Sequence, residues 1–125
     1  ANAMYLPKVI KYNAKNEEAA ERYAQIADHI GLGGTTTTEK VDALIAELRS
    51  MNDQLDIPQV IKFYGAGGVK AETSIIDEAE FLEKLPTVAA NAIGDACTGS
   101  NPRQPSQEEM EKLLKACYYD LEIDF

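Results

Sequence analysis

The sequence predicts an all-α protein, a bundle of five or six helices. Several segments carry apolar residues at i, i+3, i+4 and i+7, which is the period of one helix face. Residues that cap helices precede most of these segments. No segment alternates apolar and polar residues over a useful length, so no strand is expected. With 125 residues, 45% of them hydrophobic, the chain is long enough for one domain with a core.

The first expected helix is short and mostly apolar. Ala1-Asn2-Ala3 before Met4 resembles the remnant of an expression tag, so we expect a single helical domain over residues 4–125. Proline is tolerated best in the first turn of a helix, and Pro7 therefore places the start of this helix at about Leu6. Apolar residues begin at once with no capping residue before them, as in a helix cut from a longer chain.

Two longer helices are expected next. Asn16 can cap the first, and Gly31 supplies a left-handed stop after it. Thr36 and Glu39 fit a capping box at the start of the second, which runs for about 17 residues. Pro58 ends it, because the residue before a proline leaves the helical region. The two apolar stripes are Tyr23, Ile26, Ala27 and Ile30, and Val41, Leu44, Ile45, Leu48 and Leu55.

The second half contains a loop and at least two more helices. Residues 59–64 fit one further turn, and residues 66–73 form a glycine-containing loop. Asp77 can cap the next helix, which Pro86 is expected to break into two, over 77–84 and 86–96. After a polar connector, Ser106 and Glu109 form a capping box for the last helix. Its stripe is Met110, Leu113, Leu114 and Cys117, and a tail of aromatic and acidic residues follows over 118–125.

The composition excludes several classes of function. A net charge of −9 opposes binding to nucleic acid or to an anionic membrane, since both require clustered Lys and Arg. No apolar run approaches the roughly 20 residues of a spanning helix, and no signal peptide is visible. Two cysteines cannot build a disulfide framework, and His29 is the one histidine. The cytoplasm, with reduced thiols, is the expected compartment.

Most candidate sites have an ordinary structural explanation. The glycine clusters at 31–34 and 65–68 do not follow a strand and open a helix, as nucleotide loops do. His29 suits the last turn of its helix, where positive charge is favourable. The many carboxylates lie where solvated helix faces are expected. Cys117 falls in an apolar stripe and is expected in the core.

The polar connector 97–103 is the exception. Cys97 is its first residue, at the end of a helix, and could line a pocket. A nucleophilic role for Cys97 would need a histidine partner, and none is close in sequence. Arg103 could bind an anion, form a salt bridge with Asp95, or cap the C-terminus of a helix. Gly99 permits close approach of the backbone to another group. Asn101 precedes Pro102 and is therefore expected to be extended.

Residues 95–103, with the sequence DACTGSNPR, resemble the C-terminal part of the iron-containing alcohol dehydrogenases. This family includes lactaldehyde reductases and the alcohol dehydrogenase half of bifunctional aldehyde-alcohol dehydrogenases. Three further segments support the resemblance in the same order, from about residue 5 to residue 117. They are LPKVIKYNA at 6–14, YAQIA at 23–27 followed by Gly31, and LDIP at 55–58.

The resemblance implies a C-terminal portion of a dehydroquinate-synthase-like helical domain. The parent would be an NAD(P)-dependent enzyme with Fe2+ or another divalent metal in the cleft between two domains. Its metal ligands would lie upstream, so this chain is expected to bind neither metal nor cofactor and to be inactive alone. The resemblance places Cys97, Thr98 and Gly99 at the substrate cleft. The 65–74 loop and the 118–125 tail depart from the family pattern.

The expected partner is the missing N-terminal part of the parent enzyme. Its absence should leave an apolar patch that involves Leu6, Val9 and Ile10, and such patches promote self-association. No nucleic-acid or membrane partner is expected. The alternative is a free-standing acidic helical module that binds a protein partner.

Overall fold

The computed structural model describes residues 2–125, in which helices are joined by loops and no strand is named. The five helices are α1 (Asn2–Asn13), α2 (Glu17–His29), α3 (Thr37–Gln54), α4 (Glu78–Gly94) and α5 (Gln107–Tyr119). Three short 3-10 turns, η1 (Ile61–Phe63), η2 (Ala66–Gly68) and η3 (Thr98–Ser100), lie in the connections. The all-α prediction is therefore confirmed. Within the same residues, no helix is both long and apolar enough to cross a bilayer.

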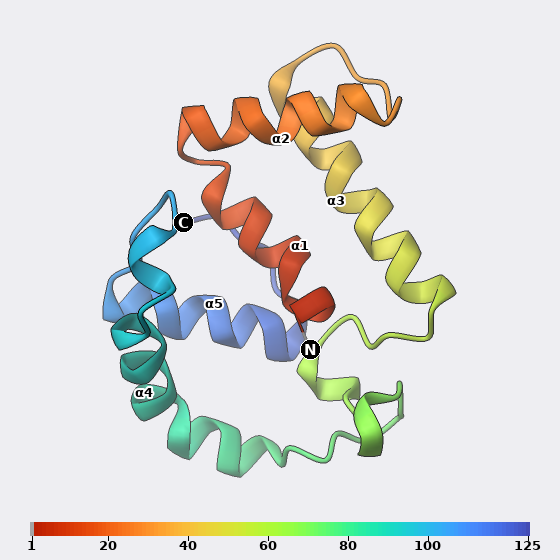
Figure 1. Cartoon of the computed structure of the whole chain (residues 1–125). Helices are drawn as coiled ribbons and strands as arrows, with labels where there is room; N and C mark the ends of the chain where they lie inside the picture. Colours follow the sequence, from red (N-terminus) through yellow and green to blue (C-terminus); the bar gives the residue numbers. More distant parts are fainter. Residues whose placement is uncertain (1) are drawn as a thin grey trace.

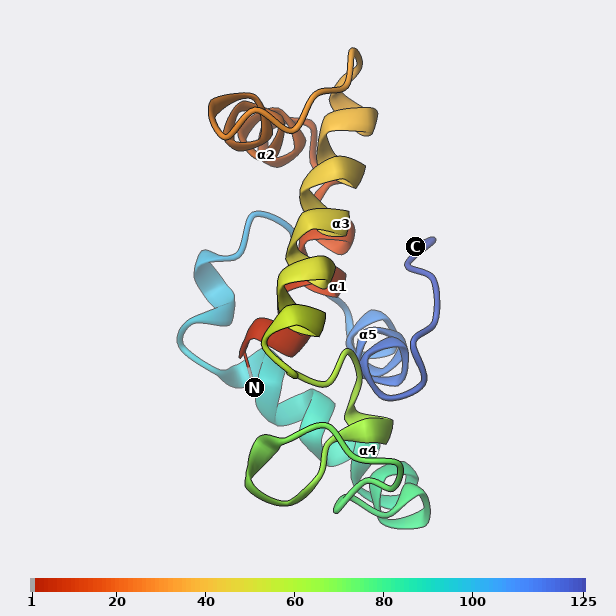
Figure 2. The same ribbon diagram turned by 90° about the vertical axis from the view of Figure 1, so that its right-hand side faces the viewer.

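Helix α1 lies at the centre of the bundle (Figure 1). It packs against α3 on one side and α5 on the other, while α2 packs on α3 and α4 packs on α5. Figure 2 shows the result from the side, with α2 at one end of an elongated molecule and α4 at the other. The buried side chains form three clusters around α1, centred on Tyr12, Ile10 and Met4.

The predicted caps are confirmed for four helices. The Asn16 side chain accepts from the Ala19 backbone N–H, and the Thr36 hydroxyl accepts from that of Glu39. Asp77 accepts in the same way at the start of α4. At α5 the capping box is complete in both directions. Side-chain acceptors thus satisfy backbone donors that have no partner inside the helix.

Helix α1 begins earlier than Pro7 allows in isolation, and the prediction of a start near Leu6 is wrong. Pro7 lies inside the helix and has no N–H to donate to the carbonyl of Ala3. The Asn52 side chain of α3 donates to that carbonyl at 2.9 Å instead. The tertiary contact replaces the missing bond, so Asn2 and Ala3 continue the helix.

The break predicted at Pro86 is a bend within one helix. Helix α4 is continuous from Glu78 to Gly94, so the expectation of two helices is wrong. Figure 1 shows that α4 turns midway along its length. Pro86 leaves the carbonyl of Leu82 without its usual donor, and Leu82 lies on an exposed part of the helix where water can approach.

The glycine-containing loop is a compact turn with its own hydrogen bonds. Before this loop, the further turn predicted over 59–64 is η1. The Gly65 N–H donates to the Val69 carbonyl at 2.8 Å, and the Ala71 N–H donates to the Phe63 carbonyl at 2.9 Å. A Cβ on Gly65 would lie 2.6 Å from the Cβ of Ala71, so this position has no room for a side chain.

The C-terminal tail packs onto the bundle. Asp120 ends α5 in the left-handed conformation, and its carboxylate binds both Arg49 at 3.0 Å and Lys8 at 2.8 Å. The hydrogen bonds from Arg49 are the main reason that the pKa of Asp120 is lowered. Beyond it, Ile123 is buried against the Tyr12 cluster. These contacts tie the tail to α1 and α3.

The predicted apolar patch on α1 is smaller than expected. Ile10 is buried with Val41 and Leu44 in the core, which corrects its place in that patch. Leu6 is exposed, and Val9 is partly buried at the edge of a cavity.

Candidate functional site

The connector between α4 and α5 is held by its own hydrogen bonds. The Asp95 carboxylate accepts from the Cys97 N–H at 2.8 Å. The Thr98 hydroxyl donates to the Ala92 carbonyl, near the end of α4. The Gln104 side chain donates to the carbonyls of Thr98 and Asn101 at 3.0 and 2.8 Å. The backbone around η3 therefore has a defined conformation.

Two asparagines fasten this connector to α1. Asn13 donates to the side-chain oxygen of Asn101 at 3.1 Å, and Asn101 donates back to that of Asn13 at 2.8 Å. Asn13 is 2% exposed and also donates to the Tyr23 hydroxyl on α2 at 3.2 Å. The pair thus joins three segments of the chain at one buried point.

Arg103 links the connector to both ends of the chain. Its guanidinium donates to the carbonyls of Tyr12 and Phe125 at 3.0 and 2.7 Å and pairs with Glu109 at 3.0 Å. It also lies 3.9 Å from the centre of the Tyr12 ring. Because Tyr12 is in the last turn of α1, the helix-capping alternative is confirmed. The alternative of a salt bridge to Asp95 is wrong.

Hydrogen bonds and charge at this point also fix the ionisation of Glu109. The pKa of its carboxyl is lowered, first by the backbone N–H of Ser106, and further by Arg103 and the Tyr12 hydroxyl. Glu109 thus remains a carboxylate that can accept hydrogen bonds from the cap and from Arg103. Burial is the main cause of the raised pKa of Tyr12.

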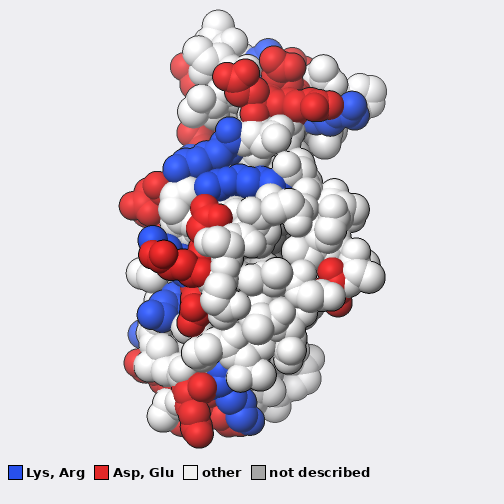
Figure 3. Space-filling model, turned by 90° about the vertical axis from the view of Figure 1, so that its left-hand side faces the viewer, with Lys and Arg blue, Asp and Glu red and all other residues white. Residues whose placement is uncertain are grey.

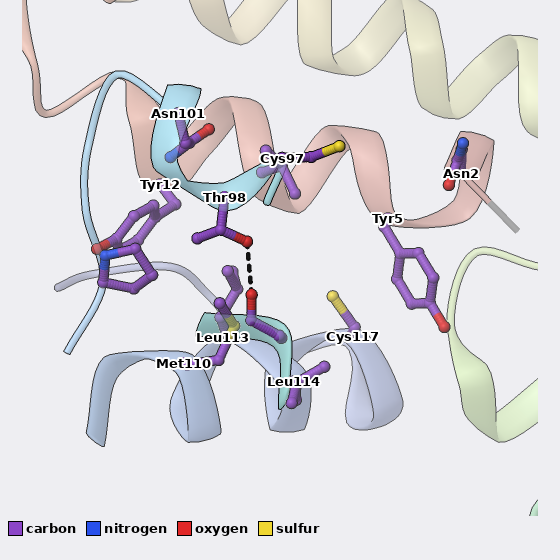
Figure 4. Close-up of a pocket in the computed structure, with 13 residues that line it drawn as sticks. Asn2, Tyr5, Tyr12, Cys97, Thr98, Asn101, Met110, Leu113, Leu114 and Cys117 are labelled. Atoms are coloured by element: carbon purple, nitrogen blue, oxygen red, sulfur yellow. Dashed lines mark hydrogen bonds between the residues drawn. The ribbon is translucent and has the colours of Figure 1, made fainter. Parts of the chain in front are cut away.

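A cavity of about 540 Å³ lies beside the connector. Its walls are α1, the end of α4 and η3, and its floor is α5. In Figure 4 the connector residues Cys97 and Thr98 lie above Met110, Leu113 and Leu114 of α5, with Tyr5 to one side. Cys97 and Thr98 line this cavity, whereas Gly99 does not. The full lining is Asn2, Tyr5, Val9, Tyr12, Ala92, Cys97, Thr98, Asn101, Pro105, Met110, Leu113, Leu114 and Cys117.

The two cysteines are free thiols in different surroundings. Cys97 is exposed, and Cys117 is buried, as predicted for a core residue. Burial raises the pKa of Cys117 from 9.0 to about 12, although Lys8 opposes this effect. Cys117 is therefore protonated at neutral pH and is a poor nucleophile. His29, at the end of α2, does not line the cavity with Cys97, so this site shows no thiol–imidazole pair.

Charge is sparse around the connector. Figure 3, which views the side of α4 and the connector, shows a broad surface below α2 with few Lys, Arg, Asp or Glu side chains. Among residues 2–125, no three His, Cys, Asp or Glu side chains are grouped as they would be to hold a metal ion. The cavity is thus an apolar feature with a few polar atoms at its edge.

The fold and the sequence of this connector define a class of protein. A family model described as "Fe-containing alcohol dehydrogenase family, C-terminal" matches residues 1–118. The chain therefore belongs to the iron-containing alcohol dehydrogenase family, and the match is to the C-terminal portion. The match begins at residue 1, and Asn2 is helical; the tag remnant expected over residues 1–3 stays a prediction.

Individual relatives agree with this family. The chain is 46% identical over 125 residues to the NADPH-dependent butanol dehydrogenase of Clostridium saccharobutylicum, covering all of this chain and 29% of that one. It is 34% identical over 134 residues to the bifunctional aldehyde-alcohol dehydrogenase AdhE of Escherichia coli (strain K12). That match covers 95% of this chain and 14% of AdhE. It is also 34% identical over 119 residues to an alcohol dehydrogenase of Thermococcus barophilus, and that match covers 95% of this chain and 27% of the relative. The chain thus spans less than a third of the length of these relatives.

The iron in the family's name has no ligand set among residues 2–125. A catalytic metal site needs about three protein ligands around one position, and no such group of side chains is present. The residues of this chain therefore do not fit a metal site of their own.

Proposed function

We propose that this chain is the C-terminal helical portion of a metal-dependent alcohol dehydrogenase that transfers hydride between a small alcohol or aldehyde and NAD(P). The observation that carries the proposal is 46% identity, over every residue of the chain, to an NADPH-dependent butanol dehydrogenase. In the oxidation direction, hydride leaves the carbinol carbon for the nicotinamide and the hydroxyl proton is released, so that an aldehyde or ketone forms. The metal and the nucleotide would be held by the rest of the enzyme.

The contribution of this chain is one wall of the substrate cleft. Cys97, Thr98 and Gly99 form the part of the connector that we assign to this wall. Cys97 has an exposed side chain, and a Cβ on Gly99 would meet no atom within 4 Å, so the surface here is open for a ligand. Asn101 and Arg103 hold the connector behind it. Their role is positioning, because their side chains donate hydrogen bonds to residues of α1 and α5.

The proposal includes the inactivity of the isolated chain. No metal-ligand group is present among residues 2–125, and the chain spans 29% of the butanol dehydrogenase that it matches. Both cysteines are free thiols, which suits a reducing compartment such as the cytoplasm.

A chimera tests this function. This chain replaces the matching C-terminal portion of the Clostridium saccharobutylicum butanol dehydrogenase, and butanal-dependent oxidation of NADPH is measured. We expect an active chimera and no activity from the 125-residue chain alone. Activity of the isolated chain, or a folded chimera without activity, would contradict the proposal.

A further inference from the structure

Residues 120–125, which we call the return segment, lead from the end of α5 back toward its start. Asp120 reverses the chain in the left-handed conformation where α5 ends. At the other end of the segment, the carbonyl oxygen of Phe125 accepts a hydrogen bond from Arg103 at 2.7 Å. The Nζ of Lys112, in the first half of α5, lies 5.7 Å from the centre of the Phe125 ring. The return segment therefore ends beside the connector between α4 and α5.

The return segment is anchored before it reaches the connector. Lys8 pairs with the Asp120 carboxylate at 2.8 Å and also donates to the Leu121 carbonyl at 2.8 Å. Ile123 is 7% exposed and belongs to the Tyr12 cluster. Because α1 fixes the course of the segment, Phe125 arrives at Arg103 from a defined direction.

Phe125 and Tyr12 share one nitrogen of Arg103. The Nη1 nitrogen carries two hydrogens, and it donates to the carbonyl oxygens of Tyr12 and Phe125. The Nη2 nitrogen pairs with the Glu109 carboxylate. The Phe125 ring also lies 5.9 Å from the ring of Tyr12, on which the guanidinium is placed. A guanidinium is planar and its donors have a fixed geometry, so these partners set its orientation as well as its position.

The position of Arg103 is passed along the connector toward the proposed cleft wall. The Asn101 side chain donates to the Arg103 carbonyl, and the Asn101 N–H donates to the Thr98 carbonyl at 3.0 Å. Pro102 lies between Asn101 and Arg103 and restricts the backbone there. A displaced Arg103 would therefore shift Thr98 through two hydrogen bonds and a stiff segment. A misplacement on the order of 1 Å can lower activity strongly when the displaced group positions a substrate.

We propose that the return segment, through Phe125 and Arg103, positions the connector for substrate binding. This inference rests on the proposed function, in which Cys97, Thr98 and Gly99 form one wall of the substrate cleft. Phe125 is a positioning residue, since it acts on that wall through Arg103. The return segment thus affects the KM for the alcohol or aldehyde, whereas the nucleotide is held by the rest of the enzyme.

Kinetics of the chimera with the Clostridium saccharobutylicum enzyme test this role. Removal of Asp124 and Phe125 takes away the carbonyl acceptor and the ring together. We expect the KM for butanal to rise about fivefold or more, while kcat and the KM for NADPH stay within about twofold. Phe125→Ala keeps the carbonyl and should raise the KM for butanal less; it also gives the comparison if the truncated protein does not fold. Phe125→Tyr keeps the ring and should retain the wild-type KM.

Two controls separate positioning from a general loss of stability. Asp124→Ala is the matched control, because Asp124 is exposed and its carbonyl still accepts from Lys15 in the variant. It should leave the KM for butanal unchanged. Leu48→Ala weakens the Ile10 cluster on α3 and should lower the melting temperature without raising this KM. An unchanged KM after truncation and in Phe125→Ala, or an equal rise in Leu48→Ala, would overturn the inference.

Hydrogen exchange in the 125-residue chain separates this inference from the proposed function, because it needs no activity. The amides of Thr98, Ser100 and Asn101 donate hydrogen bonds within the connector. In the truncated chain or in Phe125→Ala they should exchange about tenfold faster, whereas the amides of α2 keep their rates. Faster exchange together with an inactive wild-type chimera would contradict the proposed function and support the hold of the return segment on the connector. Unchanged exchange in both variants would overturn the inference whether or not the chimera is active.

Discussion

Asn13 and Asn101 exchange hydrogen bonds in both directions although 88 positions separate them in the chain. Each amide group is donor and acceptor for the other, so neither side chain can be replaced without leaving the other incomplete. The pair ties the last residue of α1 to the connector that carries Cys97. It therefore couples the central helix to the surface that we assign to the substrate cleft.

Replacing Asn101 by alanine should lower the free energy of unfolding by about 1–3 kcal/mol, because the side-chain oxygen of buried Asn13 loses its donor. The double variant Asn13→Ala/Asn101→Ala should cost less than the sum of the two single variants, by about 0.5 kcal/mol or more. Urea unfolding measures all three. Asn91→Ala on the exposed side of α4 is the control. Strict additivity would show that the two amides do not depend on each other.

Arg103→Lys should destabilise the chain by about 1–2 kcal/mol, although the charge is kept. A single ammonium cannot reproduce donation from two nitrogens to Tyr12, Phe125 and Glu109, nor the planar stacking on Tyr12. Arg22→Lys is the control, since Arg22 is exposed and makes only a 3.8 Å contact with Glu18. Equal unfolding free energies for the two variants in urea would contradict this role of the guanidinium.

The Asn52 side chain replaces the bond that Pro7 removes, and this exchange predicts a specific dependence between the two positions. Asn52→Ala should lower the free energy of unfolding by about 1–3 kcal/mol, because the Ala3 carbonyl loses its donor. In a Pro7→Ala background the backbone N–H of residue 7 can donate to that carbonyl, so the same Asn52→Ala change should cost less. Denaturant unfolding of the wild type, the two single variants and the double variant gives the comparison. An undiminished cost in the Pro7→Ala background would show that Asn52 acts in another way.

The raised pKa of Cys117 predicts a loss of stability at alkaline pH. Its thiol titrates at about 12 in the folded chain and at 9.0 ordinarily. Between these values the unfolded chain releases a proton that the folded chain retains, so the unfolded state is favoured. Stability from this group is complete below pH 9 and falls by about 1.4 kcal/mol per pH unit between pH 9 and about pH 12.

Cys117→Ala isolates this contribution. Burial also raises the pKa of Tyr5, Tyr12, Tyr118 and Tyr119, but these tyrosines are unchanged by the substitution. Unfolding free energies at pH 8 and pH 10 should differ less in Cys117→Ala than in the wild type. Cys97→Ala, at the exposed cysteine, is the matched control. A pH dependence that is unchanged in Cys117→Ala would contradict the assignment.

Local signals predicted most of the helices. The caps at Asn16, Thr36, Asp77 and Ser106 act within a few residues, so the sequence near each helix is sufficient to find them. Pro7 and Pro86 led to wrong helix boundaries, because the local sequence does not show how the fold accommodates them. Pro7 is accepted because Asn52, 45 positions away, satisfies the freed carbonyl, and Pro86 is accepted because α4 can bend at an exposed position.

The sequence singled out the connector but not the residues that support it, and the place of Cys97, Thr98 and Gly99 at a substrate cleft stays a prediction. The mixture of residues from Cys97 to Arg103 marks the connector as unusual, and the family resemblance assigns it to the cleft. The partners of Asn101 and Arg103 come from α1, α5 and the tail, at separations that no local pattern reveals. The cavity beside the connector also depends on how α1, α4 and α5 pack, so the sequence did not predict that Tyr5 and Leu114 line it.

The claim that this connector faces the substrate has one direct test. In the active chimera, Cys97→Phe adds a bulky ring at the proposed wall, and Ile30→Phe adds the same ring at an exposed position at the end of α2. We expect Cys97→Phe to lower kcat/KM for butanal by about tenfold or more, mainly through KM, and Ile30→Phe to leave it unchanged. Equal kcat/KM values for the two variants would contradict the account.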